Sequence, residues 1–244
     1  MRILAIDSSG MVATVAVVEE DEASNARTIA EYTVNYKKTH SQTLLPMLDE
    51  IVKMTEMDLG SIDAIAVAAG PGSITGLRIG SATAKGLGLA LAKPLIHIPT
   101  ADGLAYNLCY TDKLVCPIMD ARRNQVYTGI YEFEGDRMKV LEPQMAVGIE
   151  ELAERLCAYE REVVFLGGGV PGHREKLSQQ LMVGRNIYFA PAHLNRQRAA
   201  TVGTLAMQYY REGRTETAAE HRPDYLRVSQ AEREREERLR AEGK

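Results

Sequence analysis

Two aspartates, each at the end of an apolar run, are the side chains of this sequence that are best placed to do chemistry. Asp7 ends residues 3–7 and precedes Ser8 and Ser9, and Asp120 ends residues 115–120. Carboxylates in such turns could reach the Mg²⁺ or the phosphates of a nucleotide. A phosphate turn needs a glycine that lets backbone amides approach, and neither aspartate is followed directly by one. We therefore predict only a weak nucleotide or phosphate contact by Asp7, Ser8, Ser9 and Asp120, with the alternative that each aspartate anchors its own turn.

A glycine-rich helix is predicted over residues 75–92. Each glycine inside a helix costs about 1 kcal/mol relative to alanine, so several glycines need a reason. Small residues recur at every fourth position, which leaves a stripe without side chains where another backbone can come close. They are Gly76, Gly80, Ala84, Gly88 and Ala92. The stripe predicts a tight contact, either with a neighbouring helix of the same domain or with another chain.

The elements that must position these residues occur twice in the same order. The first half predicts strands at 3–7, 11–18 and 28–36, a helix after a capping box of Thr39 and Gln42, a strand at 62–69 and the glycine-rich helix. The second half predicts strands at 115–120 and 126–131, a weak strand at 139–141, a helix at 149–159 and a strand at 163–166. Two β-β-β-α-β-α units of an α/β fold explain this order.

The tandem layout resembles that of the actin-like ATPases and sugar kinases, whose domains are ribonuclease H-like. In those proteins the two aspartate turns hold phosphates and Mg²⁺, and a Gly-Gly turn, here Gly167-Gly168, supports adenosine. We expect an N-terminal actin-like domain at 1–104 and a smaller C-terminal actin-like domain at 105–227. The last helix of the second domain, predicted at 198–210, is expected to pack back on the first, and residues 228–244 form a charged tail.

Composition limits the classes of function. The net charge of -4 gives no basic surface for nucleic acid, so we expect tRNA contact only through partners. Three cysteines without CxxC spacing favour a reducing compartment, and we expect a cytoplasmic protein without a membrane segment. No metal site is predicted, because no two of the five histidines have a helical i, i+3 or i, i+4 spacing. No G-x-S-x-G nucleophile setting occurs, and no catalytic residue is predicted.

Four segments carry a more specific resemblance. The sequences GPGSITGLRIG at 70–80, IDSS at 6–9, DARRNQVY at 120–127 and PDYLR at 223–227 are similar to the TsaB (YeaZ) family of bacterial tRNA threonylcarbamoyladenosine biosynthesis proteins. The resemblance covers roughly residues 1–227. It implies a non-catalytic subunit that supports TsaD in transferring threonylcarbamoyl from threonylcarbamoyl-AMP to N6 of the adenosine beside the tRNA anticodon. It also implies TsaE as a further partner, a homodimer when TsaD is absent, and no tightly bound cofactor, with ATP or ADP at most at the interface with TsaD.

The same resemblance bears on the sites. TsaD carries a metal-binding His-x-x-x-His after the helix that matches 75–92, and residues 99–104 of this chain contain neither histidine, so no activity is expected from this chain alone. The family also places the glycine-rich helix at the contact with TsaD or with a second copy. The predicted interface residues are Gly76, Gly80, Thr83, Ala84, Leu87 and Gly88. The alternatives are a free-standing actin-like ATPase or small-molecule kinase that uses Asp7 and Asp120, and a homodimeric scaffold without a catalytic partner.

Overall fold

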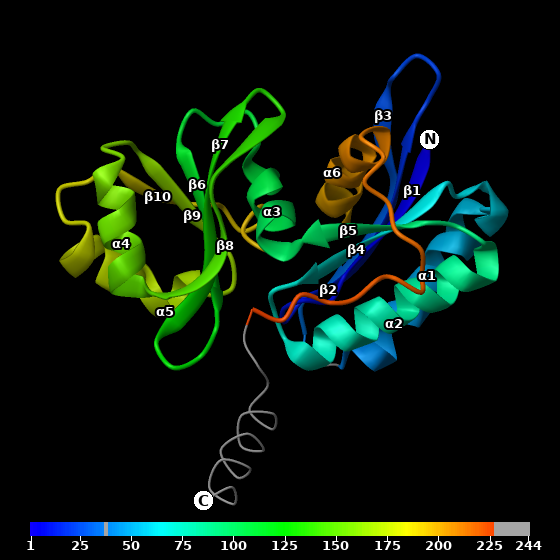
Figure 1. Ribbon diagram of the computed structural model, residues 1–244, viewed down its shortest axis with the longest axis horizontal. Helices are drawn as coiled ribbons and strands as arrows, with labels where there is room; N and C mark the ends of the chain where they lie inside the picture. The colour runs from blue at the N-terminus through cyan, green and yellow to red at the C-terminus, as the bar shows by residue number, and fades with distance from the viewer. Residues whose placement is uncertain (37–38, 227–244) are drawn as a thin grey trace, which may run out of the picture.

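The computed structural model describes residues 1–36 and 39–226 of the chain, and the predicted tail at 228–244 lies outside these residues. It contains two five-stranded sheets that stand side by side, joined by helices between them (Figure 1). Each sheet places the first strand of its unit in the centre, antiparallel to the second strand and parallel to the fourth. The tandem actin-like, ribonuclease H-like fold predicted from the repeat is therefore confirmed.

The first unit follows the predicted order of elements, and its sheet has the strand order β3-β2-β1-β4-β5. Its elements are β1 (Arg2–Asp7), β2 (Ala13–Glu20), β3 (Ala26–Val34), α1 (His40–Thr55), the short 3₁₀ turn η1 (Leu59–Ser61), β4 (Ala64–Gly70), α2 (Ile74–Leu91) and β5 (Leu95–Pro99). Strands β1 and β4 are buried along almost their whole length, because helices cover both faces of the sheet.

The second unit repeats this topology, with the strand order β8-β7-β6-β9-β10. Its elements, with the connecting helices, are α3 (Thr100–Ala105), η2 (Tyr106–Leu108), β6 (Leu114–Asp120), β7 (Gln125–Glu134), β8 (Arg137–Gly148), α4 (Ile149–Ala158), β9 (Val163–Leu166), α5 (Val170–Lys176), the π turn η3 (Leu177–Leu181), β10 (Ile187–Phe189) and α6 (Ala199–Arg211). The weak strand predicted at 139–141 lies in the first half of the much longer β8.

Two helices, α3 and α6, fill the space between the sheets. Helix α6 returns from the second unit and packs on the face of the first sheet opposite α1 and α2, where Leu205 lies in one cluster with Ile3 and Ala16. Helix α3 packs on the near face of the second sheet, where Leu104 joins Val115. The two helices contact each other, so the two units share a continuous apolar interior.

The stripe of small residues on α2 faces the chain's own sheet, which corrects the prediction that it lines a contact between chains. A Cβ atom added at Gly76 would lie 2.0 Å from the carbonyl oxygen of Ser8, and one added at Gly80 would lie 2.4 Å from the Ser8 hydroxyl. At Gly88 it would lie 2.4 Å from a methyl group of Leu95, and Ala84 is fully buried. The close approach that the small residues permit is to the turn after β1 and to β5. Of the six predicted interface residues, only Thr83 and Leu87 are partly exposed.

The residues that precede α1 and α2 differ in whether their side chains cap the helix. The side chain of Thr39 makes no capping hydrogen bond at the start of α1, so the predicted capping box with Gln42 is wrong. Helix α2 starts from Ser73, whose hydroxyl accepts a hydrogen bond from the amide of Gly76.

Candidate functional site

A cleft of about 670 Å³ opens where the two units face each other. Its walls come from the turn after β1, the start of α2, the turn after β6 and the loops before α5 and α6. The lining residues are Ser9, Gly10, Met11, Val12, Asn35, His40, Gly72, Ser73, Ile74, Thr75, Met119, Asp120, Ala121, Arg122, Tyr127, Gly168, Arg196 and Gln197. The repeat thus brings the ends of β1 and β6 to one cleft, as the tandem layout predicts.

The polar side chains of the turn after β1 form hydrogen bonds within the chain. The Asp7 carboxylate accepts hydrogen bonds from the amide of Ser9 at 2.8 Å and from its hydroxyl at 2.6 Å. The Ser8 hydroxyl donates to the carbonyl of Gly76 at 2.8 Å. Burial raises the pKa of Asp7 to about 6, against the opposing effects of the two Ser9 hydrogen bonds and of the charge of His40. All three side chains are buried, and they tie the turn to the start of α2.

The turn after β6 presents its aspartate differently. Asp120 is exposed and lines the cleft, and its carboxylate accepts a hydrogen bond from the amide of Arg122 at 2.6 Å. Residues 122–124 all have positive φ angles, of 62°, 55° and 58°, which turn the chain back sharply into β7. Asp120 therefore anchors its own turn and at the same time offers carboxylate oxygens to a ligand in the cleft.

The two glycine turns are equivalent in the repeat, with Gly167 in the place of Gly70. Gly70 has a φ of +128°, and a Cβ atom there would lie 2.2 Å from the carbonyl oxygen of Asp224. Gly168 lines the cleft, and an added Cβ would meet no atom within 4 Å. Gly167 has a φ of +107°, and a Cβ atom there would lie 2.4 Å from the carbonyl oxygen of Ile118, so both equivalent glycines are closed by backbone of the same chain. In the second turn it is the next residue, Gly168, that has free space on the cleft side.

These positions can be compared with the predicted phosphate contacts residue by residue. Asp7 and Ser8 are buried and do not line the cleft, and their side chains hydrogen-bond to Ser9 and Gly76, so the phosphate contact stays a prediction that this arrangement does not favour. Ser9 lines the cleft, but its hydroxyl donates to Asp7. Asp120 keeps the geometry that the prediction requires.

The chemistry of the cleft is that of a polar binding site. His40, Arg122 and Arg196 provide its basic groups, and Ser73 and Thr75 provide hydroxyls at the start of α2. Among the residues described, the cleft contains no serine, cysteine or threonine paired with a base and an orienting carboxylate. Its lining is suited to contacting an anionic ligand or a partner's side chains.

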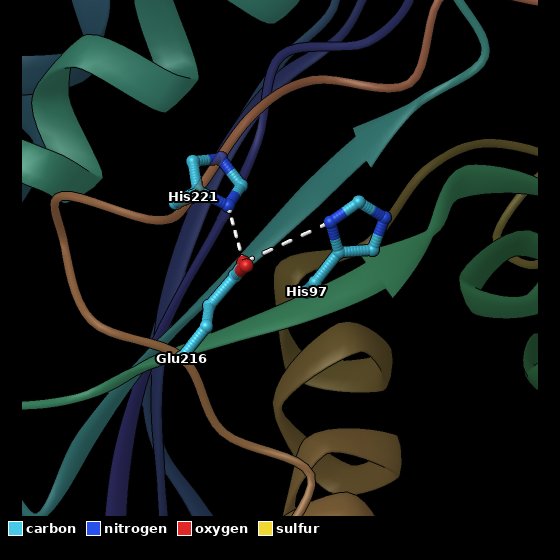
Figure 2. Close-up of side chains that lie close together, drawn as sticks. All are labelled: His97, Glu216 and His221. Carbon is cyan, nitrogen blue, oxygen red and sulfur yellow. Dashed lines mark hydrogen bonds and ion pairs between the residues drawn. The ribbon is translucent and has the colours of Figure 1, made fainter.

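A second group of polar residues lies outside the cleft and was missed by the sequence analysis. The C-terminal strap, residues 212–226, runs back along β5 and α2 and brings Glu216 and His221 beside His97 of β5 (Figure 2). The helical spacing rule could not find this group, because its histidines come from a strand and from a segment far along the chain. The one local signal was the Thr-x-x-Glu pattern at 217–220, which forms a capping box in the strap.

The tandem sheets, the central strand order and the cleft between the two units define an actin-like α/β protein. The profile described as TsaD, tRNA N6-adenosine threonylcarbamoyltransferase, matches residues 27–235. The chain is 34% identical to the tRNA threonylcarbamoyladenosine biosynthesis protein TsaB of Bacillus subtilis over 95% of this chain and 96% of that protein. It is 30% identical to TsaB of Escherichia coli over 93% and 95% of the two chains.

A solved structure agrees with these relatives. YeaZ from Pseudomonas aeruginosa superposes with a TM-score of 0.76 at 26% identity, covering 92% of this chain and 99% of that one. The chain belongs to the TsaB family of tRNA threonylcarbamoyladenosine biosynthesis proteins, within the wider TsaD-type group. The resemblance found in the four sequence segments is confirmed. No helix among residues 1–36 and 39–226 is both long and apolar enough to cross a membrane.

Proposed function

We propose that this chain is a non-catalytic subunit of a cytoplasmic complex in which TsaD transfers threonylcarbamoyl from threonylcarbamoyl-AMP to N6 of the adenosine beside the tRNA anticodon. The observation that carries the proposal is family membership over almost the whole chain, combined with a cleft whose described residues include no catalytic constellation. The matching segment to the TsaD metal motif is α3, whose Thr100 and Leu104 cannot replace two histidines. We also propose that TsaE is a member of this complex, and that the chain contacts tRNA only through the complex.

The outward face of α2 supports a contact with TsaD, or with a second copy of the chain when TsaD is absent. Its exposed residues are Thr75, Arg78, Ala82, Gly86, Leu89 and Ala90, with Thr83 and Leu87 at the margin. Helix α2 contains no acidic residue, and Leu89 exposes 71% of its surface. A flat helix face of small and apolar residues is suited to packing against another helix. Because the chain matches the TsaD profile, TsaD can present an equivalent helix, and the two can pair about an approximate twofold axis.

A nucleotide contact is a narrower proposal. We propose that ATP or ADP binds beside Asp120 and Gly168, which line the open side of the cleft, and that TsaD supplies the rest of the site. The buried Asp7 is left out of this site, since its carboxylate is engaged with Ser9.

The decisive experiment reconstitutes the reaction from purified TsaD, TsaE, tRNA, ATP, threonine and bicarbonate, with the enzyme that makes threonylcarbamoyl-AMP. Modified adenosine is measured with and without this chain. We expect modification only when the chain is present, and no transfer by the chain without TsaD. Equal modification in its absence would refute the proposal.

A matched pair of variants tests the contact surface. Ala82→Arg places a long charged side chain on the outward face of α2, and Ala158→Arg places the same side chain on the exposed end of α4. Both are exposed helix positions, so both should change stability by less than about 0.5 kcal/mol. We expect Ala82→Arg to weaken TsaD capture by about 30-fold or more, the effect of about 2 kcal/mol at a packed interface. Ala158→Arg should bind TsaD normally, and equal binding by both variants would place the contact elsewhere.

The alternative of a free-standing ATPase or small-molecule kinase has its own test. The purified chain is incubated with Mg-ATP and released phosphate is followed, with Asp120→Ala as the variant. Turnover that the variant abolishes would favour the enzyme over the subunit.

A further inference from the structure

The C-terminal strap is folded so that its acidic and imidazole groups meet at β5. The Glu216 amide donates to the carbonyl of Leu95 at 2.9 Å, and the Leu95 amide donates back to the carbonyl of Glu216 at 2.8 Å. Immediately afterwards the Thr217 amide donates to the Glu220 carboxylate at 2.9 Å, and the Glu220 amide donates to the Thr217 hydroxyl at 3.2 Å. This capping box starts a helical turn that brings His221 back over Glu216.

Three potential metal ligands converge there. Figure 2 shows a carboxylate oxygen of Glu216 between the imidazole rings of His97 and His221. Glu216 Oε1 lies 2.6 Å from His221 Nδ1 and 3.8 Å from His97 Nδ1, and the three atoms all lie within 4.8 Å of one another. Among the described residues this is the one group of at least three His, Cys, Asp or Glu ligand atoms that lie this close together.

Hydrogen bonding sets the state of His97. Its Nε2 donates to the Asp224 carboxylate at 3.0 Å, which leaves Nδ1 as the ring nitrogen that can bind a metal ion. Nδ1 lies 3.8 Å from Glu216 Oε1, where a protonated ring would form an ion pair. A metal cation at this position would take the place of that proton between the nitrogen and the carboxylate oxygen.

The other ring is hydrogen-bonded to the shared carboxylate. The side chain of His221 is fully buried, its Nδ1 donates to Glu216 Oε1 at 2.6 Å, and its Nε2 has no hydrogen-bond partner among the described residues. A metal ion would take the place of the Nδ1 proton, which would move to Nε2 so that Nδ1 becomes a ligand.

We propose that His97, Glu216 and His221 form a binding site for a divalent transition-metal ion, and specifically for zinc. Two imidazoles and one carboxylate are a common zinc donor set with one coordination position left for water. Ligand atoms about 2.1 Å from one ion are about 3.4 Å apart at the tetrahedral angle and at most about 4.2 Å apart, so the three atoms must each move by less than about 1 Å. The side chains of His97 and Glu216 are about a quarter exposed, which leaves a path for the ion and its water.

Two neighbouring charges complete the site. Asp224 orients His97 through its second ring nitrogen, the arrangement that carboxylates commonly adopt behind metal-binding histidines. Lys85 of α2 donates to the carbonyl of His221 at 3.0 Å, so its positive charge lies near the site, opposed by the carboxylates of Glu216 and Asp224. A bound ion would fasten the strap to β5, in addition to the backbone pairing at Leu95.

The test titrates Zn²⁺ into the full chain after treatment with a chelator, and follows heat by calorimetry and metal content by mass spectrometry. Co²⁺ serves as a spectroscopic probe, because four-coordinate cobalt gives visible absorption bands. We expect one Zn²⁺ per chain and a rise in the thermal unfolding temperature with Zn²⁺. The variants His97→Gln and Glu216→Gln should bind at least 100-fold more weakly, and Asp224→Asn about 10- to 100-fold more weakly, the usual effect of losing a carboxylate behind a ligand.

His193→Gln is the matched control, because His193 is exposed and lies outside the group. It should bind Zn²⁺ like the unchanged chain. His221 is too deeply buried to be a clean probe, so the partly exposed His97 and Glu216 carry the test. The proposal is overturned if the unchanged chain binds no stoichiometric Zn²⁺, or if it does and both ligand variants retain it. The readout is binding, so the result does not depend on whether the chain supports TsaD.

Discussion

Two glycines of α2 that differ only in the face they occupy allow a sharp test of how this helix packs. Gly80 lies on the buried face, where a new Cβ would be 2.4 Å from the Ser8 hydroxyl oxygen. Gly86 lies on the outward face, where a new Cβ would meet no atom within 4 Å. Both are interior positions of the same helix, so the gain in helix propensity from alanine, about 1 kcal/mol, is the same for both.

The surroundings of each glycine supply the remaining contributions to stability. At Gly86 nothing opposes the gain, and Gly86→Ala should raise the free energy of unfolding by up to about 1 kcal/mol. At Gly80 the Ser8 hydroxyl must rotate away and lose its hydrogen bond to Gly76, which leaves a buried group unsatisfied at a cost of about 1 to 3 kcal/mol. Strain from overpacking adds about 1 to 3 kcal/mol. After subtracting the propensity gain, Gly80→Ala should lower the free energy of unfolding by about 1 to 5 kcal/mol.

Urea denaturation followed by far-UV circular dichroism measures both variants against the unchanged chain. Light scattering at the same concentration checks that the oligomeric state is unchanged, so that the comparison reports on the chain itself. If Gly80→Ala gains as much stability as Gly86→Ala, the stripe does not pack on the turn after β1, and α2 must present a different face to the sheet.

The remaining predictions concern the buried carboxylate, the returning helix and tRNA. The pKa of Asp7 is about 6 in the folded chain, against 3.8 for an ordinary aspartate. Between pH 3.8 and pH 6 the folded chain therefore holds a proton that the unfolded chain releases, and this proton binding stabilises the fold. The stabilisation is lost as the pH rises through about 6. The free energy of unfolding of the unchanged chain should therefore fall relative to that of Asp7→Asn by about 2 kcal/mol between pH 4 and pH 8, measured by urea denaturation. Parallel pH profiles of the two chains would contradict this. Leu205→Ala on α6 should lower the free energy of unfolding by about 2 to 5 kcal/mol, and a loss below about 1 kcal/mol would show that α6 is not part of the core of the first sheet. The chain alone, with a net charge of -4, should bind tRNA no more tightly than about 10⁻⁴ to 10⁻⁶ M at physiological salt in a fluorescence assay, and nanomolar binding would refute the electrostatic argument.

Local patterns in the sequence were enough for the architecture. Apolar runs of strand length that end at Asp7 and Asp120, followed by turn residues and a returning strand, predict the first two strands of each unit. These signals are local because a strand buried on both faces must be apolar along its length, whatever its neighbours are. The same order of elements in both halves then predicts the tandem fold, which the two matching sheets confirm.

Contacts between residues that are distant in the sequence decided which face of α2 is buried and which of the two aspartates is exposed. The four-residue spacing on α2 required a close neighbour, but only the tertiary structure shows that Ser8 and Leu95 are that neighbour. Asp7 and Asp120 look equivalent along the chain, yet packing against α2 buries one and leaves the other exposed in the cleft.

The group around Glu216 gives the clearest physical reason for this limit. His97 and His221 follow no helical spacing, and each has an ordinary local context in the sequence. They meet because the strap pairs with Leu95 and then turns at the capping box. This pairing is a single isolated bridge, which is too short to leave a periodic pattern in either segment. The sequence by itself determined the order of the long elements, but not the short β5, α3, α5 and β10, which carry too few residues for a clear pattern. The tertiary structure decided which side chains face one another.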